Sequence, residues 1–388
     1  MRFTMKILFV HNFYQLAGGE DQVFWAEQAL MKENGHDVYA YTVNNDTIQS
    51  LSSKFKAAFN LNYSKSSKKL FATHLAKVNP DIVHCHNFFP LLTPSIFDAC
   101  KEKNIPSVLT LHNYRLICPS ACLMHNDKPW EISIKYSPYC TIPFKVYKNS
   151  FLGTASLARM ISYHKRRKTW SKSIERIITL TQFSKRKFIE AGFSEVNMVV
   201  KPNFIQDPDQ RDLKRKPYAL FIGRLSREKG INFLLDSWKN IDYSLKIIGD
   251  GPEKHKISSN LKNIEYLGSL PNDQVKKILG EAQMLIFPSQ WYEGFPMVLV
   301  EALACGTPVI VSNIGSMQEI IEHGKNGLHY ELGDQEDFCN KVNQLIQNKK
   351  YCSTLGEAGR QKYLNNYTPE LNYHHMVSIY QEAISLKN

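Results

Sequence analysis

The sequence predicts an α/β fold with two doubly wound, Rossmann-like domains, and three observations support this prediction. Short apolar stretches rich in β-branched residues alternate with helical patterns along almost the whole chain. These stretches are apolar throughout rather than alternately polar, as expected for parallel strands covered by helices on both faces. The alternation occurs twice, on either side of a polar segment with three prolines at 201–217.

The expected elements follow from this alternation. In the first half we expect strands at 6–12, 37–43, 81–86, 107–112, 176–181 and 197–202, with helices at 20–34, 65–78, 92–103 and 182–192. In the second half we expect strands at 218–225, 244–250, 264–270, 284–289, 308–313 and 327–331, with helices between them. Residues 113–150 break the pattern, with no clear period and many aromatic residues and prolines. Such an insertion after a strand is often a lid or a binding loop.

The domain organisation is predicted from the same pattern. We assign residues 1–200 to a first domain, 201–217 to a linker, 218–368 to a second domain, and 369–388 to a C-terminal helix that can cross back to the first domain. Ligands of doubly wound sheets bind at the carboxyl ends of the strands. Two such domains facing each other would form a cleft, which is where we expect the site.

Composition indicates a globular protein of the cytoplasm. The 388 residues are 43% hydrophobic, and no apolar run approaches the roughly 18 residues that span a bilayer. The apolar stretch near the N-terminus is too short for a signal peptide and fits a first strand. The eight cysteines contain no CxxC pair and are expected to be free thiols. A zinc site made by Cys118, Cys122, Cys140 and His125 is the disfavoured alternative, because the spacing is irregular.

The charge is unevenly distributed along the chain. The net charge is +12, and residues 1–200 hold 26 Lys and Arg against 14 Asp and Glu, whereas residues 201–388 hold 22 of each. The excess positive charge is therefore confined to the first half. It is either a solvated basic surface or a surface that faces a membrane leaflet, a phosphorylated substrate or nucleic acid.

Two segments of the second half suggest a phosphate and sugar site. In FIGRLSREKG (221–230), Arg224 and Lys229 follow a strand and precede a helix, an arrangement suited to a diphosphate or to a solvated turn. In WYEGFPMVLVEALACG (291–306), Pro296 fits a helix start, so Glu293 lies in a loop and Glu301 within the helix. Glu301 has only apolar neighbours, and a carboxylate is costly to bury without a partner, which favours a role in binding a diol.

The first half offers weaker motifs. Gly18 and Gly19 follow the first strand at a helix start, where they form either a plain turn or a close approach to a phosphate or acceptor. His112 stands at a strand end. Two further patterns, the glycines of IIGDGPE (247–253) and the Asp207-Pro208-Asp209 triplet, are interpreted as turns rather than as a dinucleotide fingerprint or a metal site.

Together these residues resemble glycosyltransferase family 4, whose members are retaining enzymes with the GT-B fold. The Glu-x7-Glu pair with EGFP, the GRLSREKG segment and the Gly18-Gly19 loop carry the resemblance, which extends over essentially the whole chain. The similarity of AGGEDQVF and LHNYRLICP points to bacterial members that build cell-surface polysaccharides such as capsule or O-antigen. The resemblance implies a UDP- or GDP-sugar as donor and neither a metal nor another cofactor.

The resemblance also implies roles for individual residues. Arg224 and Lys229 would hold the diphosphate, Glu301 the ribose, and Glu293 the donor sugar. The backbone that would position the sugar and the β-phosphate is formed by Gly294, Phe295, Pro296, Met297 and Val298. From the first domain, Gly18 and Gly19 would close over the phosphates or the acceptor, and His112 would approach the donor sugar. We infer in addition that Tyr114 and Arg115 touch the acceptor.

The basic first domain is consistent with a glycan or polyprenyl-linked acceptor at the inner face of a membrane. The runs 54–71 and 163–176 mix basic with aromatic and apolar residues, as interfacial segments do and as solvated basic helices also can. We expect a cytoplasmic, peripheral enzyme that does not bind nucleic acid. The alternatives are a sugar-nucleotide epimerase on the same fold, and a basic nucleic-acid-binding protein without enzymatic activity, which the sequence supports only by its charge.

Overall fold

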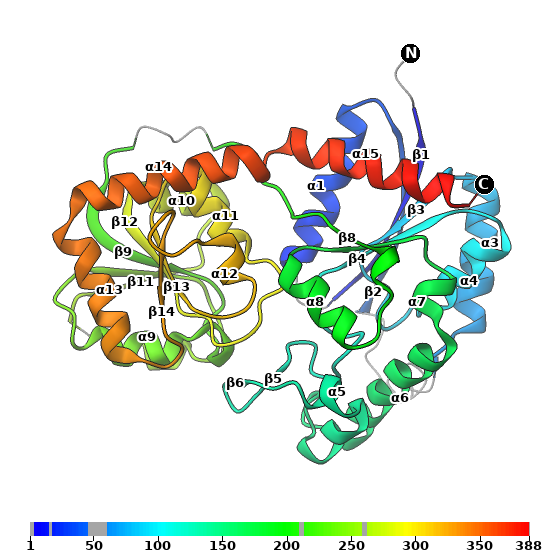
Figure 1. The fold of residues 1–388 in the computed structure, drawn as a ribbon, viewed down its shortest axis with the longest axis horizontal. Coiled ribbons are helices and arrows are strands. Elements are labelled where there is room, and N and C mark those ends of the chain that lie inside the picture. The colour runs from blue at the N-terminus through cyan, green and yellow to red at the C-terminus, as the bar shows by residue number, and fades with distance from the viewer. Residues whose placement is uncertain (1–3, 15–17, 46–59, 209–212, 258–261, 388) are drawn as a thin grey trace. The chain divides into compact units, whose positions relative to one another are not determined.

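The structure is a computed structural model that describes residues 4–14, 18–45, 60–208, 213–257 and 262–387. It divides into two compact units, each built around one parallel sheet (Figure 1). The first unit contains Met1–Leu123, Glu131–Asn203 and Glu370–Asn388, and the second contains Met124–Trp130 and Phe204–Pro369. The predicted class, α/β with two doubly wound sheets, is confirmed.

The first unit has a six-stranded sheet in the order β2-β1-β3-β4-β7-β8, with every neighbouring pair parallel. Its strands are β1 (Lys6–Phe13), β2 (Asp37–Asn44), β3 (Ile82–Cys85), β4 (Ser107–Leu111), β7 (Arg176–Thr179) and β8 (Met198–Val200). Its helices are α1 (Gly19–Glu33), α3 (Lys65–Val78), α4 (Ser95–Glu102), α5 (Ile132–Lys135), α6 (Phe151–Arg167), α7 (Thr169–Lys172), α8 (Gln182–Glu190) and α15 (Pro369–Ser385), of which α15 belongs to this unit from Glu370 onward. All six strands expected in this half are present, within a few residues of their expected bounds.

The second unit repeats the design with the order β11-β10-β9-β12-β13-β14, again parallel throughout. Its strands are β9 (Lys216–Ile222), β10 (Leu245–Ile248), β11 (Ile264–Gly268), β12 (Ala282–Phe287), β13 (Val309–Ser312) and β14 (Leu328–Tyr330). Its helices are α9 (Ile231–Trp238), α10 (Asn272–Glu281), α11 (Met297–Ala304), α12 (Met317–Ile320), α13 (Gln335–Gln347) and α14 (Lys349–Asn366). The six strands predicted for this half are also found.

Helices bury both faces of the second sheet. One apolar cluster joins side chains of β9, β12 and β13 to those of α11 and α14, and a second joins the same sheet to α9 and α13. Along β9 the side chains alternate between the two clusters, with Leu220 in the first and Ala219 and Phe221 in the second. This double coverage explains why the strands are apolar along their whole length.

In the first unit, the C-terminal helix completes the core. Met376, Ile379 and Tyr380 of α15 pack in one cluster with Phe24 of α1 and with side chains of β1, β3, β4 and β7. Figure 1 shows α15, in red, beside α1. The last helix is therefore part of the first unit, although the second unit lies between them in the sequence.

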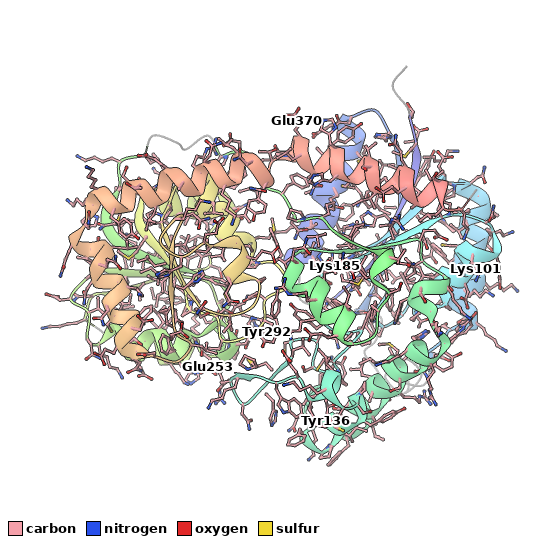
Figure 2. All side chains as sticks on the ribbon, viewed as in Figure 1. Lys101, Tyr136, Lys185, Glu253, Tyr292 and Glu370 are labelled. Carbon is pink, nitrogen blue, oxygen red and sulfur yellow. The ribbon has the colours of Figure 1, made fainter. Side chains whose placement is uncertain are left out.

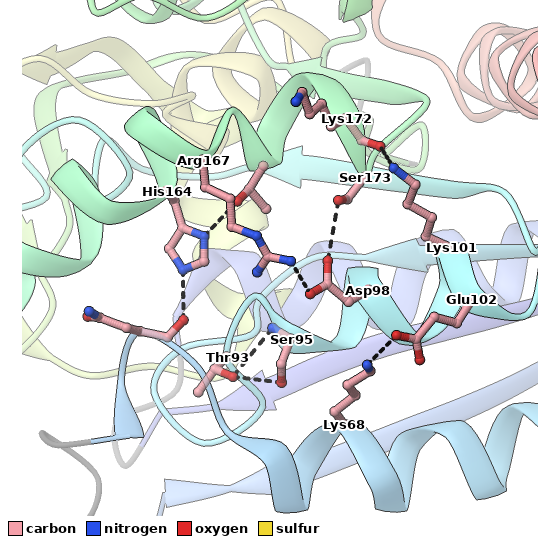
Figure 3. Close-up of polar contacts among 12 residues, drawn as sticks. Lys68, Thr93, Ser95, Asp98, Lys101, Glu102, His164, Arg167, Lys172 and Ser173 are labelled. Atoms are coloured by element: carbon pink, nitrogen blue, oxygen red, sulfur yellow. Dashed lines mark hydrogen bonds and ion pairs between the residues drawn. The ribbon is translucent and has the colours of Figure 1, made fainter.

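The irregular segment after β4 is divided between the two units: Met124–Trp130 belongs to the second unit, and the residues from Glu131 onward belong to the first. It contains the hairpin of β5 (Met124–His125) and β6 (Lys128–Pro129), then α5 and the 3-10 helix η2 (Pro138–Phe144), and leads into α6. Polar contacts tie the end of α6 and α7 back to α4 (Figure 3). The guanidinium of Arg167 donates to the Asp98 carboxylate at 2.7 Å, and the ammonium of Lys101 donates to the carbonyl oxygen of Lys172 at 3.0 Å.

Each sheet has one point where the chain reverses its direction of strand addition. In the first unit this point lies between β1 and β3, and in the second between β9 and β12. Helices that leave such neighbouring strands diverge to opposite faces, which opens a crevice at the carboxyl ends of the strands. The predicted site residues of both halves follow these strands or their immediate neighbours.

Candidate active site

The loop after β9 carries the two predicted cations. Arg224 is exposed, and its guanidinium makes no hydrogen bond or ion pair with any residue that the structure describes. Lys229 ends the short 3-10 helix η4 (Arg227–Lys229), and Gly230 follows with φ +75°. A Cβ atom on Gly230 would lie 1.8 Å from the carbonyl oxygen of Pro288, so only glycine lets this loop approach the loop after β12 so closely.

That approach brings Lys229 to Glu293, which is 5% exposed. The Oε1 atom of Glu293 accepts three hydrogen bonds of 2.7 Å, from the Lys229 ammonium, the Ser289 hydroxyl and the Trp291 indole N–H. The Ser316 hydroxyl donates to the main-chain carbonyl oxygen of Glu293 at 2.8 Å. Glu293 is thus held in one position as a carboxylate, and it partly neutralises Lys229.

Helix α11 begins immediately after Pro296, as predicted, so its first turn contains Met297 and Val298. The N–H groups at the start of a helix have no intrahelical acceptors and can bind an anion. Gly294 and Phe295 precede the helix and are half-buried. The chain thus brings free amides to the same end of the sheet as Arg224 and Lys229.

Glu301 lies on the fifth residue of α11, and its side chain is half-buried. Burial raises the pKa of this carboxyl, and the charge of Lys276 opposes that shift. No residue within the described part of the chain gives the Glu301 carboxylate a hydrogen bond or an ion pair. A desolvated carboxylate without a partner is costly in a folded protein and typical of a ligand-binding group.

Two patterns interpreted as turns have structural explanations. A Cβ on Gly249 would lie 1.9 Å from the carbonyl oxygen of Gly223, and one on Gly251 would lie 2.4 Å from that of Leu225. The glycines of IIGDGPE therefore allow the loop after β10 to pack on the loop after β9. In the Asp-Pro-Asp triplet, Asp207 accepts two hydrogen bonds of 2.7 Å from Arg360, and Asp209 lies outside the described residues.

In the first unit, Gly18 is the N-cap of α1 and Gly19 is its first residue. The Asp21 carboxylate accepts a hydrogen bond of 2.9 Å from the Gly18 N–H and so closes the end of the helix. A Cβ at either glycine would meet no described atom within 4 Å. Within the described residues, no steric contact requires glycine at these two positions.

His112 follows β4 directly and contacts another histidine. Its Nε2 lies 3.0 Å from Nδ1 of His86, and the two rings stack with centroids 5.2 Å apart. Burial, and then the neighbouring His86, hold the pKa of His112 well below its usual value, so the ring is neutral at physiological pH. His112 lines a cavity of about 30 Å³ together with Tyr14, Asn113 and Arg115.

The two residues after Asn113 differ in their surroundings. Tyr114 is 1% exposed, stacks on Phe188 and shares a hydrogen bond of 3.0 Å with the Ser184 hydroxyl, so this side chain packs in the core. The guanidinium of Arg115 instead lies over the ring of Phe89 at 4.6 Å. Its Nε and Nη1 atoms are buried and have no hydrogen-bond partner among the described residues, while the side chains of Tyr14 and Glu20 lie near the guanidinium.

Sequence reasoning missed a buried ionic cluster in this unit. Glu27 of α1 and Lys201 after β8 are fully buried and paired at 2.7 Å. His84 of β3 and the following His86 lie 3.8 Å and 3.3 Å from the Glu27 carboxylate. The signal was present: Glu27 interrupts an apolar helix face, as Glu301 does, and His84 and His86 are alternate residues of the run predicted as a strand at 81–86.

With this geometry in place, the chain can be compared with known families. Residues 204–362 match the family described as glycosyl transferases group 1, and residues 28–207 match glycosyltransferase family 4. Together the two matches cover residues 28–362, and the chain belongs to the group 1 glycosyltransferases of family 4. The GT-B fold that the resemblance implied is confirmed with it.

Individual members of the family and of the fold agree with this assignment. An uncharacterized glycosyltransferase of Methanocaldococcus jannaschii is 38% identical over 149 residues, which are 37% of this chain and 42% of the relative. The capsular polysaccharide biosynthesis glycosyltransferase CapM of Staphylococcus aureus is 26% identical over 223 residues, which are 53% of this chain and 58% of CapM. The chain therefore spans about half the length of these curated relatives. The Anabaena protein HepE, solved in complex with UDP, shares the fold with a TM-score of 0.69 at 17% identity over 96% of this chain and 99% of that one.

Two clusters in this family 4 chain have the spacing of metal ligands: Glu27 with His84 and His86, and His11 with Glu20 and Asp21. In the first, the Lys201 ammonium already supplies a positive charge to Glu27. In the second, burial and the neighbouring Asp21 raise the pKa of Glu20 to about 8, which disfavours a charged ligand.

None of the eight cysteines is in a disulfide. Among the described residues, Cys118, Cys122, Cys140 and His125 are not in a group with the spacing of metal ligands. Within the described residues, no helix is long and apolar enough to cross a membrane.

Proposed function

We propose that this protein is a retaining glycosyltransferase that moves a sugar from a nucleotide-diphosphate sugar to an acceptor hydroxyl, without a metal. The observation that carries the proposal is the group of polar and charged residues at the carboxyl ends of the strands of the second sheet. The Lys229–Glu293 pair and the N-terminal amides of α11 follow β9 and β12, the two strands of the switch point. The side chains of Arg224 and Glu301 follow the same strands and have no partner within the described part of the chain. HepE, which has the same fold, binds UDP, and this supports a nucleoside diphosphate as part of the donor.

The donor groups would divide among these residues. Arg224 and Lys229 bind the diphosphate, and the amides of Met297 and Val298 add the positive end of the helix dipole. Glu301 accepts hydrogen bonds from the two hydroxyls of the ribose, which supply the partners that its carboxylate lacks. Glu293 and the backbone of Gly294 and Phe295 bind the hydroxyls of the transferred sugar.

The transfer step requires little covalent chemistry from the protein. The acceptor oxygen forms a bond to the anomeric carbon on the face from which the phosphate departs, and the bond between that carbon and the phosphate oxygen breaks. The departing phosphate oxygen takes the proton of the acceptor hydroxyl, so a nucleoside diphosphate leaves and the configuration is retained. Arg224 and Lys229 stabilise the negative charge that develops on the leaving group.

The surroundings of Glu293 argue against a covalent glycosyl-enzyme. Hydrogen bonds from several donors, above all from a cation, stabilise the charge of a carboxylate and so lower its reactivity as a nucleophile. Here Oε1 accepts hydrogen bonds from three donors, one of them a cation. Glu293 is better suited to hold the sugar and to stabilise positive charge at the anomeric carbon.

The first unit would bind the acceptor, a lipid-linked or cell-surface glycan, beside an anionic membrane surface. Five large apolar side chains are exposed within a short stretch around η2 and the start of α6: Tyr136, Tyr139, Phe144, Phe151 and Leu152. Lys135, Lys145 and Lys148 stand among them in the sequence. Tyr136 is labelled in Figure 2 on this part of the unit. Aromatic side chains with interspersed lysines are typical of surfaces that enter the headgroup layer. The similarity to CapM supports a role in surface polysaccharide synthesis.

The proposal is tested by incubating the protein with a panel of UDP- and GDP-sugars, with and without polyprenyl-linked acceptors, and by following the products with NMR. We expect nucleoside diphosphate and a glycoside of the same anomeric configuration as the donor, both dependent on acceptor. An inverted product contradicts retention. Conversion of the donor sugar to its epimer without an acceptor supports the epimerase, and binding of nucleic acid in place of any nucleotide sugar supports the non-enzymatic alternative.

A further inference from the structure

A groove of about 420 Å³ opens on the first unit, between α5, the end of α6 and the turn after α8. Its floor is apolar and is formed by the side chains of Leu116, Ile117, Ile161 and Trp170, each of which is at most 6% exposed. A volume of this size is typical of a pocket that binds a small molecule. The groove therefore offers a dry surface to an apolar ligand.

Two lysines give the rim of this groove a positive charge. Lys165 is in the last turn of α6 and Lys168 caps that helix, and both line the groove. Their ammonium groups make no hydrogen bond or ion pair with any described residue, and none of the described lining residues is acidic. The stem of Lys165 passes over Gly192 after α8, where a Cβ would lie 3.2 Å from its Cε and 3.5 Å from its Nζ. Packing against this turn places the ammonium at the groove.

The other basic side chains at the end of α6 are directed elsewhere. The Arg167 guanidinium donates to the Asp98 carboxylate at 2.7 Å (Figure 3). Arg166 is not among the described lining residues, and its Nε donates to the carbonyl oxygen of Ser162 at 3.4 Å. A helix end that only complements its dipole would need no such division. The unpaired charge is thus concentrated in the groove.

A buried hydroxyl lines the same groove. Ser133 of α5 is 5% exposed, and its Oγ has no hydrogen-bond partner among the described residues. A buried polar atom without a partner is unusual in a folded protein, and a bound ligand would supply the missing hydrogen bond. An apolar floor with two cations and a free hydroxyl is complementary to an apolar chain that ends in phosphate.

Two lining residues connect the groove to other parts of the first unit. Leu116 also lines the cavity that contains His112, so the groove and that cavity share a wall. Tyr136, labelled in Figure 2, is 79% exposed and belongs to the aromatic stretch around η2. The groove is therefore continuous with the surface proposed to contact the membrane and adjacent to the cavity proposed to receive sugars.

We propose that this groove binds the first part of the isoprenoid chain of a lipid-linked acceptor, while Lys165, Lys168 and Ser133 bind its diphosphate. Two unpaired ammonium groups match a diphosphate better than the single phosphodiester of most phospholipids, which carries less charge. This inference rests on the proposed function for the sugar that the lipid carries. Binding of the lipid diphosphate itself can be measured without any transfer.

The test is calorimetric titration of the full chain with farnesyl diphosphate, a short isoprenoid diphosphate, without detergent or membranes. We expect binding, and we expect farnesol and inorganic diphosphate to bind roughly tenfold or more weakly, because each lacks one half of the ligand. Lys165→Met keeps the stem over Gly192, and Lys168→Asn suits the φ of +54° at that position. Each substitution should weaken binding of farnesyl diphosphate roughly tenfold.

Arg166→Met is the matched control, because it removes a charge from the same helix end outside the groove. It should bind farnesyl diphosphate like the wild type. Acetylation of lysines, read by mass spectrometry, locates the ligand independently: farnesyl diphosphate should protect Lys165 and Lys168 but not Lys172, which is exposed and is not among the described lining residues. Protection also distinguishes this groove from the diphosphate site proposed in the second unit.

The outcomes separate this inference from the proposed function. Equal affinity of the wild type and both lysine variants overturns the groove, as does a lack of protection or inorganic diphosphate that binds as tightly as farnesyl diphosphate. Equal competition by a short-chain phosphatidylglycerol assigns the groove to a bilayer lipid and also overturns the proposal. Binding with protection in a protein that transfers no sugar supports the groove and counts against the proposed reaction. Transfer to a lipid-linked acceptor with an unchanged KM in both lysine variants supports the reaction and overturns the groove.

Discussion

The ammonium of Lys229 lies 2.7 Å from Oε1 of Glu293, and this ion pair joins the loops that follow β9 and β12. In the proposed donor site the diphosphate would lie beside this pair, so the carboxylate would compete with the ligand for the cation. A nucleotide sugar that enters the site would draw Lys229 toward its phosphates. The Ser289 and Trp291 donors would keep Glu293 in place when Lys229 turns away.

This relationship predicts opposite effects on nucleotide binding for the two partners. Lys229→Met should weaken UDP or GDP binding roughly tenfold, because a charge-assisted contact is lost. Glu293→Gln should preserve or tighten binding, because it frees the cation, yet it should slow transfer by roughly 10²-fold. Calorimetry and initial rates on both variants provide the measurement. If Glu293→Gln weakens nucleotide binding as much as Lys229→Met, Glu293 and the nucleotide do not compete for the Lys229 ammonium.

The close approach of the two loops predicts that Gly230 is irreplaceable. In Gly230→Ala, the new Cβ would meet the Pro288 carbonyl oxygen at 1.8 Å, in addition to the cost of a positive φ. We expect the free energy of unfolding to fall by about 2 kcal/mol or more. Gly333→Ala, also at positive φ but with nothing within 4 Å, should lose less. Urea unfolding measures the free energy of unfolding of both variants. Equal decreases would show that the close approach of Gly230 to the Pro288 carbonyl does not contribute to stability.

Buried histidines predict a loss of stability in mild acid. Burial lowers the pKa of both His11 and His164 from 6.5 to about 4. Between about pH 6.5 and 4 the unfolded chain binds more protons at these groups, so stability is fully present above this range. It falls as the pH drops through it, by up to about 1.4 kcal/mol per pH unit for each histidine.

His164 offers a control for this effect. Its Nε2 donates to the carbonyl oxygen of Asn62 at 2.7 Å, and its Nδ1 contacts the Thr169 hydroxyl (Figure 3). A Gln side chain can preserve the first contact but cannot titrate. As the pH is lowered, the urea midpoint of unfolding should therefore fall less steeply in His164→Gln than in the wild type. An identical slope would show that His164 does not contribute to the pH dependence.

The exposed aromatic stretch predicts binding to anionic vesicles. The double substitution Phe151→Ser and Leu152→Ser should weaken binding to phosphatidylserine-containing vesicles roughly tenfold or more at low salt, because two apolar side chains leave the interface. Val196→Ser, at another exposed apolar residue, should have no effect. Vesicle sedimentation at two salt concentrations measures this. Equal binding by all three proteins would exclude the stretch around η2 as the membrane surface.

The fold was predictable because every strand is a short apolar run between helical patterns. The register of β9 against β12 and the packing of Gly230 on Pro288 were not, since they depend on contacts distant in sequence. Glu301 was found because a carboxylate within an apolar helix is conspicuous. The same reasoning applied to Glu27 would have suggested a buried partner, but nothing local identifies Lys201, which is 174 residues away.

The site predictions also show where proximity in sequence misleads. Tyr114 and Arg115 are adjacent and both follow β4, yet one packs in the core while the guanidinium of the other has two buried atoms without a partner. The two residues differ only in the direction in which their side chains point, and the turn that contains them sets this direction. The membrane segment was expected at 54–71 and 163–176, of which residues 54–59 lie outside the described part of the chain. Among the described residues, the exposed apolar side chains around η2 and the start of α6 lie between these runs, and Leu70 is exposed within the first, so the interpretation of 54–71 and 163–176 stays a prediction.

The central claim is that the end of the second sheet binds a nucleoside diphosphate, and calorimetric titration of UDP and GDP tests it most directly. The decisive comparison is Arg224→Ala with Arg227→Ala, because Arg227 lies in the same loop but pairs with Glu253 at the surface. We expect the wild type and Arg227→Ala to bind at least one of the two nucleotides equally well, and Arg224→Ala and Glu301→Ala to bind it roughly tenfold more weakly. Absence of binding in the wild type, or equal affinity in all four proteins, would contradict the account.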